Sequence, residues 1–236
     1  MIPLRDANPT RRTALVTLAI VVACGIVFGW ELGLLGRGEA AFEAAITEWG
    51  VVPARLTAAW ERGEFLSFES LTLLSSQFLH GGWLHLLGNL LYLWIFGNNV
   101  EDRLGRAGFL LFYLTGGVVA GLAQVAIDPS SPIPTIGASG AIAATLGAYL
   151  VLYPRARVTS FVFLGFFYQL VQVPAAIVLV LWFALQLLDG IGSLGVSQGG
   201  GVAFFAHIGG FVFGAVVAWL LNLLGTDRPA RRMGVG

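Results

Sequence analysis

Long runs of apolar residues constrain this chain more than any other feature of its sequence. Of its 236 residues, 57% are hydrophobic and only 11% are charged, and the mean hydropathy is +0.82. A helix needs about 20 mostly apolar residues to cross a bilayer, whereas a soluble domain of this length would need far more charge on its surface. The sequence therefore predicts an all-α polytopic membrane protein with six transmembrane helices, at about residues 14–34, 78–97, 109–127, 138–153, 171–188 and 202–224.

The remaining segments complete the expected organisation. Residues 1–13 and 225–236 are expected to be terminal tails on either side of a membrane domain at 14–224. The first apolar run is longer than the roughly 7–15-residue core of a signal peptide and lacks a clear cleavage site, which favours a retained span. The acidic segment 36–77 fits amphipathic helices in the membrane interface. Residues 158–168 are apolar but too short for a seventh span, which predicts a re-entrant or interfacial piece before the fifth span.

The arginines predict the orientation of the bundle. All 13 basic residues are Arg, and cytoplasmic loops of membrane proteins carry an excess of such charges. With the N-terminus inside, ten arginines are in the cytoplasm and three are in the acidic first loop. Positive charges in such a long loop have less influence on the orientation. Both termini are therefore expected in the cytoplasm, and loops one, three and five outside. We expect an integral protein of a bacterial inner membrane with its site near the outer face.

We single out five polar side chains inside the expected spans, where polar groups are costly and usually functional. His80, His85 and Asn89 are in the second span, Ser139 opens the fourth, and His207 is in the sixth. These three spans all run from outside to inside and carry their polar residues early, so the groups should lie at similar shallow depths. His85 and Asn89 are four residues apart and share a helix face, whereas His80 points elsewhere.

Several kinds of hydrolytic site do not fit this set. There is no His-Glu-x-x-His motif and no cysteine cluster, so a zinc protease is disfavoured, and the single Cys24 cannot form an internal disulfide. An aspartyl protease needs two carboxylates that share a site, and a Ser-His-Asp triad needs one, but Glu31 and Asp189 are expected at helix ends. A Ser-His pair without an acid remains, and it requires neither a metal nor another cofactor.

Ser139 lies in the sequence Gly137-Ala138-Ser139-Gly140 at the predicted start of a helix. A serine flanked by glycines in a membrane helix most often serves packing. At a helix N-terminus, however, unpaired backbone N–H groups and the helix dipole favour an oxyanion. His207 is a candidate general base for the serine hydroxyl. The two residues together favour a nucleophilic site over simple packing.

With these motifs, the chain resembles the rhomboid family of intramembrane serine proteases over about residues 65–220. The motifs are His80-x4-His85-x3-Asn89, Gly137-Ala138-Ser139-Gly140 and Ala206-His207-x2-Gly210-x3-Gly214. The resemblance implies that Ser139 is the nucleophile and His207 the general base. It also implies an oxyanion hole made by His85, Asn89 and the Ser139 backbone N–H, with His80, Gly137 and Gly210 in supporting positions. Transmembrane proteins in the lipid bilayer would be the substrates, and no nucleic acid is involved.

The chain departs from the family pattern at two places. Leu71-Thr72 stands where relatives often carry Trp-Arg, and Ala143 stands where an aromatic residue commonly stacks on the catalytic histidine. We therefore expect another residue, such as Phe204 or Phe205, to position the His207 ring, or the ring to be held loosely. The glycine-rich loop at 190–201 is expected to be mobile.

Two other functions remain as alternatives. A non-catalytic rhomboid-like protein would bind and escort membrane helices, although such relatives typically lose the serine or the histidine. A small transporter or channel would place polar residues through the full depth of the membrane, whereas here they are shallow. The natural substrate and the oligomeric state do not follow from the sequence.

Overall fold

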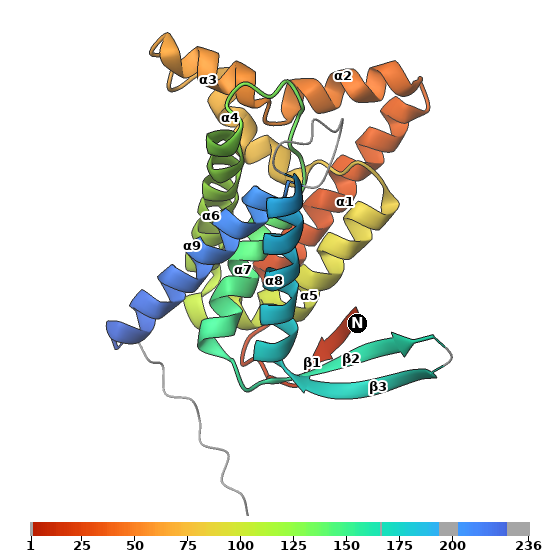
Figure 1. Cartoon of the computed structure of the whole chain (residues 1–236), viewed down its shortest axis with the longest axis vertical. Helices are drawn as coiled ribbons and strands as arrows, with labels where there is room; N and C mark the ends of the chain where they lie inside the picture. Colours follow the sequence, from red (N-terminus) through yellow and green to blue (C-terminus); the bar gives the residue numbers. More distant parts are fainter. Residues whose placement is uncertain (1, 166, 194–202, 226–236) are drawn as a thin grey trace, which may run out of the picture.

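The structure, a computed structural model, describes residues 2–165, 167–193 and 203–225. It is a bundle of helices with a small β-sheet at one end (Figure 1). The bundle contains α1 (Leu15–Leu35), α5 (Trp83–Leu104), α6 (Arg106–Ile127), α7 (Ser139–Leu152), α8 (Ala175–Ser193) and α9 (Phe204–Leu223). Shorter helices join α1 to α5: α2 (Glu39–Trp49), α3 (Pro53–Glu61), α4 (Phe68–Ser75) and the 3-10 turn η1 (Ser76–Phe78). Most of the expected loop-five glycines lie outside the described residues.

Four of the described helices, α1, α6, α8 and α9, are long and apolar enough to cross a membrane. The other two expected spans also correspond to helices of the bundle, but with different properties. The α5 helix ends in charged residues, and α7 has only 14 residues. At 1.5 Å per residue, α7 is roughly 21 Å long, which is shorter than the hydrocarbon layer of about 30 Å. The α7 helix by itself is therefore too short to cross that layer.

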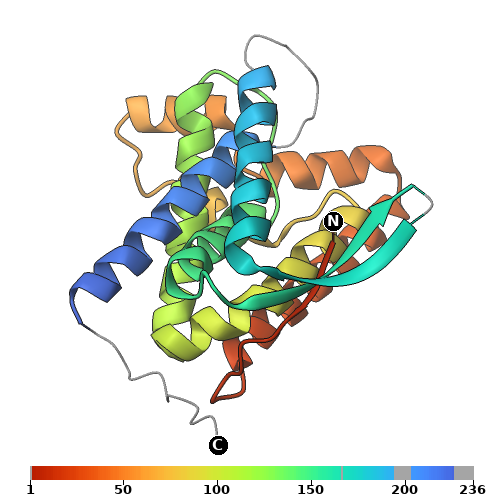
Figure 2. The same ribbon diagram turned by 60° about the horizontal axis from the view of Figure 1, so that its bottom comes forward.

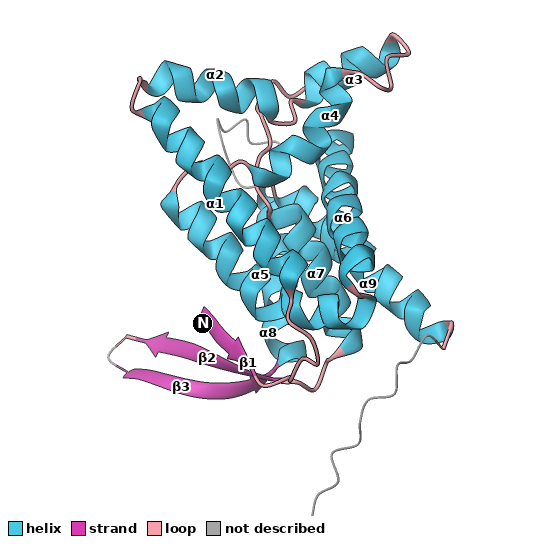
Figure 3. Cartoon of the chain, turned by 180° about the vertical axis from the view of Figure 1, so that it is seen from behind, coloured by secondary structure: helices cyan, strands magenta, loops and turns pink. Residues whose placement is uncertain are grey.

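Helices α2, α3 and α4 cover one end of the bundle, and the sheet lies at the opposite end (Figures 1 and 3). Pro53 occupies the first turn of α3, where its missing N–H costs nothing. The Ser67 hydroxyl caps α4 by accepting a hydrogen bond from the Ser70 N–H. This segment is the one for which amphipathic interfacial helices were expected.

The prediction of a re-entrant piece at 158–168 was wrong. These residues belong to β2 (Arg157–Leu164) and β3 (Phe167–Pro174), which pair antiparallel, with Gly165 at φ +63° between them. A third strand, β1 (Ile2–Asp6), pairs antiparallel with β2. The segment is rich in Val, Phe, Tyr and Thr, which favour strands over helices. The apolar residues of this segment suggested a membrane element. Its pairing with β1 could not be seen from the sequence, because β1 lies more than 150 residues away. Figure 2 shows the sheet extending sideways from the bundle.

Asp6 fastens the N-terminal strand to the bundle. Its Oδ2 accepts hydrogen bonds from the Tyr149 hydroxyl on α7 and from the Asn99 side chain on α5, both at 2.7 Å. Burial raises the pKa of the Asp6 carboxyl above its ordinary value, and these two donors offset only part of that effect. The contact ties the expected N-terminal tail to α5 and α7.

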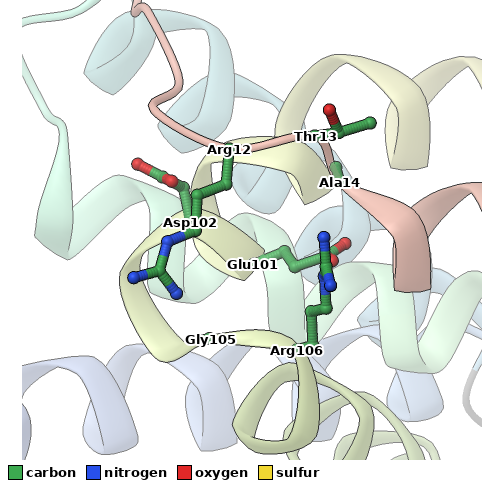
Figure 4. A pocket seen from close by; sticks show the side chains of 7 residues that line it. All are labelled: Arg12, Thr13, Ala14, Glu101, Asp102, Gly105 and Arg106. Atoms are coloured by element: carbon green, nitrogen blue, oxygen red, sulfur yellow. The ribbon is translucent and has the colours of Figure 1, made fainter.

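Glu101 fastens the start of α1 at the same end. Its carboxylate accepts hydrogen bonds from the backbone N–H groups of Val16 and Thr17 and from the Thr17 hydroxyl. These N–H groups are among those that a helix start leaves without a partner. Figure 4 shows the small cavity beside this contact, about 10 Å³ in volume and lined by Arg12, Asp102 and Arg106 among others. It has room for about one water molecule and none for a peptide.

Glycines let the backbones of α7 and α9 touch. A methyl group on Gly210 would overlap the carbonyl oxygen of Gly140, and one on Gly214 would overlap that of Ala144. From the other side, a methyl group on Gly147 would overlap the carbonyl oxygen of Phe211. Small residues permit such close approach between membrane helices.

Two glycines of α6, Gly117 and Gly121, make room for the segment before α5. Gly117 lies against the side chain of Gln77, and a methyl group on Gly121 would lie 3.0 Å from the Leu73 side chain. Gln77 is buried and donates to the carbonyl oxygens of Leu73 and Leu114. This face of α6 therefore holds α4 and η1, the segment that leads to α5.

We expect the substitution Gly214→Ala to destabilise the bundle. The new methyl group meets backbone atoms of Ala144, which cannot rotate away, so we expect a loss of about 1–3 kcal/mol, the usual cost of overpacking a core. Thermal unfolding of the purified protein in detergent measures it. Gly25→Ala on α1 is the matched control, because no atom lies within 4 Å of the added methyl group. Equal unfolding temperatures for the two variants would contradict the contact.

Candidate active site

Ser139 is the first residue of α7 and follows a tightly held loop. Thr135 pairs with Val51, the link between α2 and α3, through backbone hydrogen bonds of 3.0 and 2.8 Å. The Gly137 N–H donates to the carbonyl oxygen of Ser76 at 2.9 Å. Gly137 has φ +121°, a conformation that side chains rarely adopt. The residues that connect α1 to α5 thus set the position of the serine.

The His207 side chain meets Ser139 from the first turn of α9. Its Nε2 lies 2.7 Å from the Ser139 Oγ, which is hydrogen-bonding distance. His207 is buried, with 8% of its surface exposed. The close approach of α7 and α9 makes this distance possible: Gly210, about one turn after His207, lies against the backbone of Gly140, the residue after Ser139.

The other ring contacts of His207 come from α8. The Nδ1 of His207 lies 2.6 Å from the Oε1 of Gln186. The Trp182 ring, one turn earlier on α8, packs against the imidazole with ring centroids 5.9 Å apart. The expectation that Phe204 or Phe205 would position this ring was wrong. Trp182 and Gln186 were missed because their spacing of four residues looks like ordinary helix packing in an apolar span.

His85 approaches the serine from α5. A methyl group on Gly137 would lie only 2.6 Å from the His85 Nε2 and 3.6 Å from the Ser139 Oγ, so the three residues converge on one point. Glycine is the residue that leaves room for the imidazole. The Gly81 N–H donates a long hydrogen bond of 3.4 Å to the His85 Nδ1, on the far side of the ring.

Asn89 follows His85 by one helical turn and is buried, with 8% of its surface exposed. Among the described residues, its Nδ2 has no hydrogen-bond partner. Buried polar groups in proteins are almost always paired, so an exception calls for an explanation. The free amide is a donor that an oxygen atom of a bound molecule could satisfy.

His80 lies in the turn before α5, not on the helix as the spacing argument assumed. It is fully buried, and its ring packs edge-on against His85 with centroids 5.2 Å apart. The His80 N–H donates to both carboxylate oxygens of Glu31, at 2.9 and 3.2 Å. Glu31 was expected at the end of the first span, but it is buried within α1. It positions the turn that carries His80.

The polar groups at this site fit hydrolysis by a side-chain nucleophile. A serine hydroxyl bonded to an imidazole nitrogen, at the start of a helix, with further N–H groups nearby, is the arrangement used for acyl transfer. Among the described residues, no group of three or more His, Cys, Asp or Glu side chains is placed to hold a metal ion. The acidic residue of a serine protease triad is replaced by the Gln186 amide at the His207 ring.

The chain is similar in sequence to known proteins. The model of the Rhomboid domain matches residues 67–223, about two thirds of the chain. Rhomboid protein 1, mitochondrial, of Saccharomyces cerevisiae is 26% identical over 168 residues, which are 69% of this chain and 45% of the relative. Rhomboid protease GluP of Bacillus subtilis is 38% identical over 134 residues, or 57% of this chain and 25% of the relative.

A third relative comes from a plant. Rhomboid-like protein 11, chloroplastic, of Arabidopsis thaliana is 30% identical over 155 residues, or 63% of this chain and 51% of the relative. The chain thus spans between about a quarter and a half of the length of these relatives. The matched domain contains α5, α7 and α9, the helices that carry His85, Ser139 and His207. On the match to its domain model, this integral membrane protein belongs to the rhomboid family.

Proposed function

We propose that this protein is an intramembrane serine endopeptidase that cleaves transmembrane segments of other proteins with a Ser139–His207 dyad. The observation that carries the proposal is the 2.7 Å separation between the Ser139 Oγ and the His207 Nε2. The family includes a named protease, GluP of Bacillus subtilis. Relatives that only bind membrane helices typically lack one of these two residues, and here both are present and in contact.

The dyad supplies the nucleophile and the base for the first step. His207 removes the proton from the Ser139 hydroxyl while Oγ bonds to the scissile carbonyl carbon. The tetrahedral intermediate then breaks its C–N bond, and the His207 imidazolium gives its proton to the leaving amine. In the second half, His207 activates a water molecule, which releases the acyl group and restores the serine. No metal, nucleotide or other cofactor takes part in this scheme.

Three N–H donors are available for the oxyanion of the intermediate. The Ser139 backbone N–H has no acceptor within α7 because it is in the first turn. The His85 Nδ1 accepts from the Gly81 N–H, which leaves the ring proton on Nε2, the atom beside Gly137 and Ser139. The Asn89 amide is the third donor and is free of other partners within the described residues. His80 supports His85 through ring packing.

A location below the membrane surface follows from the length of α7. If its C-terminal end lies at one interface, a helix of roughly 21 Å puts Ser139 inside the hydrocarbon layer. We propose that all six bundle helices span or enter the bilayer. The N-terminal strand and the end of α9 lie at the sheet end (Figures 1 and 2). We propose that this end is cytoplasmic, since seven of the ten arginines among the described residues belong to segments at this end.

Location in the plasma membrane of a bacterium is a further part of the proposal. In this orientation the site lies near the outer face of the membrane, below α2–α4. A substrate segment would reach the site from the lipid. Relatives occur in mitochondria and chloroplasts by their names, so the compartment itself needs its own measurement.

Loss of either dyad residue should abolish cleavage. We expect Ser139→Ala and His207→Ala each to remove turnover of a model transmembrane substrate, because the two side chains act as a unit. Mass spectrometry of the products, after incubation in detergent or liposomes, is the measurement. A fluorophosphonate probe should label the wild type and not the Ser139→Ala protein.

The control for this experiment is Ser130→Ala. Ser130 lies in the loop before α7, and its hydroxyl bonds only to Asp128 among the interactions described. It should cleave like the wild type. Wild-type turnover by the Ser139→Ala protein would overturn the proposal. A wild type that binds a transmembrane segment but neither cleaves nor labels would favour a non-catalytic escort instead.

Asn89→Ala should lower kcat with little change in KM. A lost oxyanion donor costs on the order of 10²–10³ in turnover elsewhere, and we expect less here because two donors remain. An asparagine that serves helix packing alone contributes about 0.6–2 kcal/mol to stability. Kinetics at a temperature where the variant is fully folded separate the two roles. A lower melting temperature with unchanged kcat would assign Asn89 to packing.

The orientation predicts which cysteines an impermeant thiol reagent reaches in intact cells. In a Cys24→Ala background, Leu66→Cys in the fully exposed α3–α4 link should react from outside. Arg155→Cys, exposed between α7 and β2, should react only after the cells are opened. The reverse labelling pattern would place the site near the cytoplasmic face.

A further inference from the structure

The imidazole of His207 is held at both nitrogens, and only one of the two partners belongs to the dyad. Nε2 lies 2.7 Å from the Ser139 Oγ, and Nδ1 lies 2.6 Å from the Gln186 Oε1. Both distances are short for hydrogen bonds of these types. Gln186 is on α8, whereas Ser139 and His207 are on α7 and α9, so three helices meet at one ring.

The chemistry of the amide determines which nitrogen carries the proton. A carbonyl oxygen accepts hydrogen bonds and cannot donate them, so the Gln186 Oε1 pairs with a protonated Nδ1. A neutral imidazole has one N–H and one free lone pair. With the proton on Nδ1, the lone pair is on Nε2, and it faces the Ser139 hydroxyl. This is the tautomer that a general base for serine requires.

We propose that Gln186 is a positioning residue that completes a Ser139–His207–Gln186 arrangement by holding His207 in the reactive tautomer. The proposal rests on the proposed protease function and adds a residue to its site. Gln186 does not touch the substrate or the reacting atoms and acts only through His207.

An amide suits this position better than the carboxylate of a soluble serine protease. A carboxylate beside a buried ring inside a bilayer carries a large desolvation cost, whereas an amide is neutral. Its oxygen still fixes the tautomer and the ring orientation. The cost is weaker stabilisation of the imidazolium that forms when His207 takes the serine proton.

Trp182 supplies the second restraint on the ring. It precedes Gln186 by one helical turn, so the two side chains lie on the same face of α8. Its ring plane is tilted by 39° to the imidazole, and it also stacks on Phe211 of α9. Ala143, on the α7 side, has only a methyl group and is fully buried. The aromatic packing against the His207 ring therefore comes from α8 and not from α7.

The first test is the tautomer itself, read by nitrogen-15 NMR of the detergent-solubilised full chain with labelled histidine. The chain has three histidines, so His80→Asn and His85→Asn variants assign the signals. We expect His207 to carry its proton on Nδ1 in the wild type, and to lose this preference in Gln186→Met, which has a similar shape but no acceptor oxygen. A proton on Nε2 in the wild type would overturn the inference, whether or not the protein cleaves peptides.

The second test is kinetic and uses two substitutions at the same position. Gln186→Met should lower kcat by roughly 10- to 100-fold, the range found when a partner that orients a histidine is removed from a metal site, with KM nearly unchanged. Gln186→Glu should restore most of the lost kcat, because an acid group offers an acceptor oxygen to Nδ1 in either protonation state. Equal kcat for the wild type and Gln186→Met, with both proteins folded, would overturn the positioning role.

The matched control is Gln124→Met on α6. Its Oε1 accepts from the Ala206 N–H at 3.3 Å, so it holds the same turn of α9 without touching the His207 ring. We expect a lower melting temperature and an unchanged His207 tautomer. If Gln124→Met changed the tautomer as Gln186→Met does, the effect would reflect loosening of α9 and the inference would fail. Absence of cleavage by the wild type would instead contradict the proposed function.

Discussion

The contact between the backbones of α7 and α9 is the constraint on which the rest of the molecule depends. Glycines at 147, 210 and 214 remove the side chains that would separate the two helices. Only at that distance can a short serine side chain reach an imidazole on the neighbouring helix, at 2.7 Å. Helix association in lipid lacks the hydrophobic driving force available in water, so close packing of small residues has to supply much of the stability. The same glycines therefore stabilise the bundle and build the site.

Polar groups inside the bundle fall into two sets with different consequences. Some polar groups form hydrogen bonds that hold the fold together: Glu31 accepts from the His80 N–H, and Glu101 caps the first turn of α1. Others are buried yet keep a donor or acceptor without a partner among the described residues, such as the Asn89 Nδ2 and the His80 Nε2. The paired groups fix elements in place. Asn89, one turn from His85, leaves a donor available where the proposed reaction would develop negative charge.

The position of Ser139 also depends on parts of the chain far from the dyad. The loop before α7 is held by backbone bonds from Val51 and Ser76 at one end of the bundle. At the other end of α7, Tyr149 donates to Asp6 of the N-terminal strand. The helix that carries the proposed nucleophile is thus fastened at both ends, which is the kind of rigidity that a preorganised site requires.

Much of the site could be predicted from the sequence, because its polar residues stand out against an apolar background. The apolar runs located the helices of the bundle, and the cost of polarity in lipid singled out His80, His85, Asn89, Ser139 and His207 as candidates. Glu31 and Gln186 were not recognised, since a polar residue near the end of a span has no distinctive pattern. The sheet was missed because β2 and β3 are as apolar as the spans, and because β1 pairs with β2 across most of the chain, a pairing on which sequence periodicity carries no information.

The sequence alone therefore established the class of protein and its helical segments, and predicted the chemical types of residue in its candidate site. The tertiary structure decided which side chains meet. The rotation of α8 about its axis brings Trp182 and Gln186 to the His207 ring, and the turn before α5 brings His80 against His85. Rotation and approach of helices are set by packing between residues far apart in the chain, and no local pattern in the sequence encodes them.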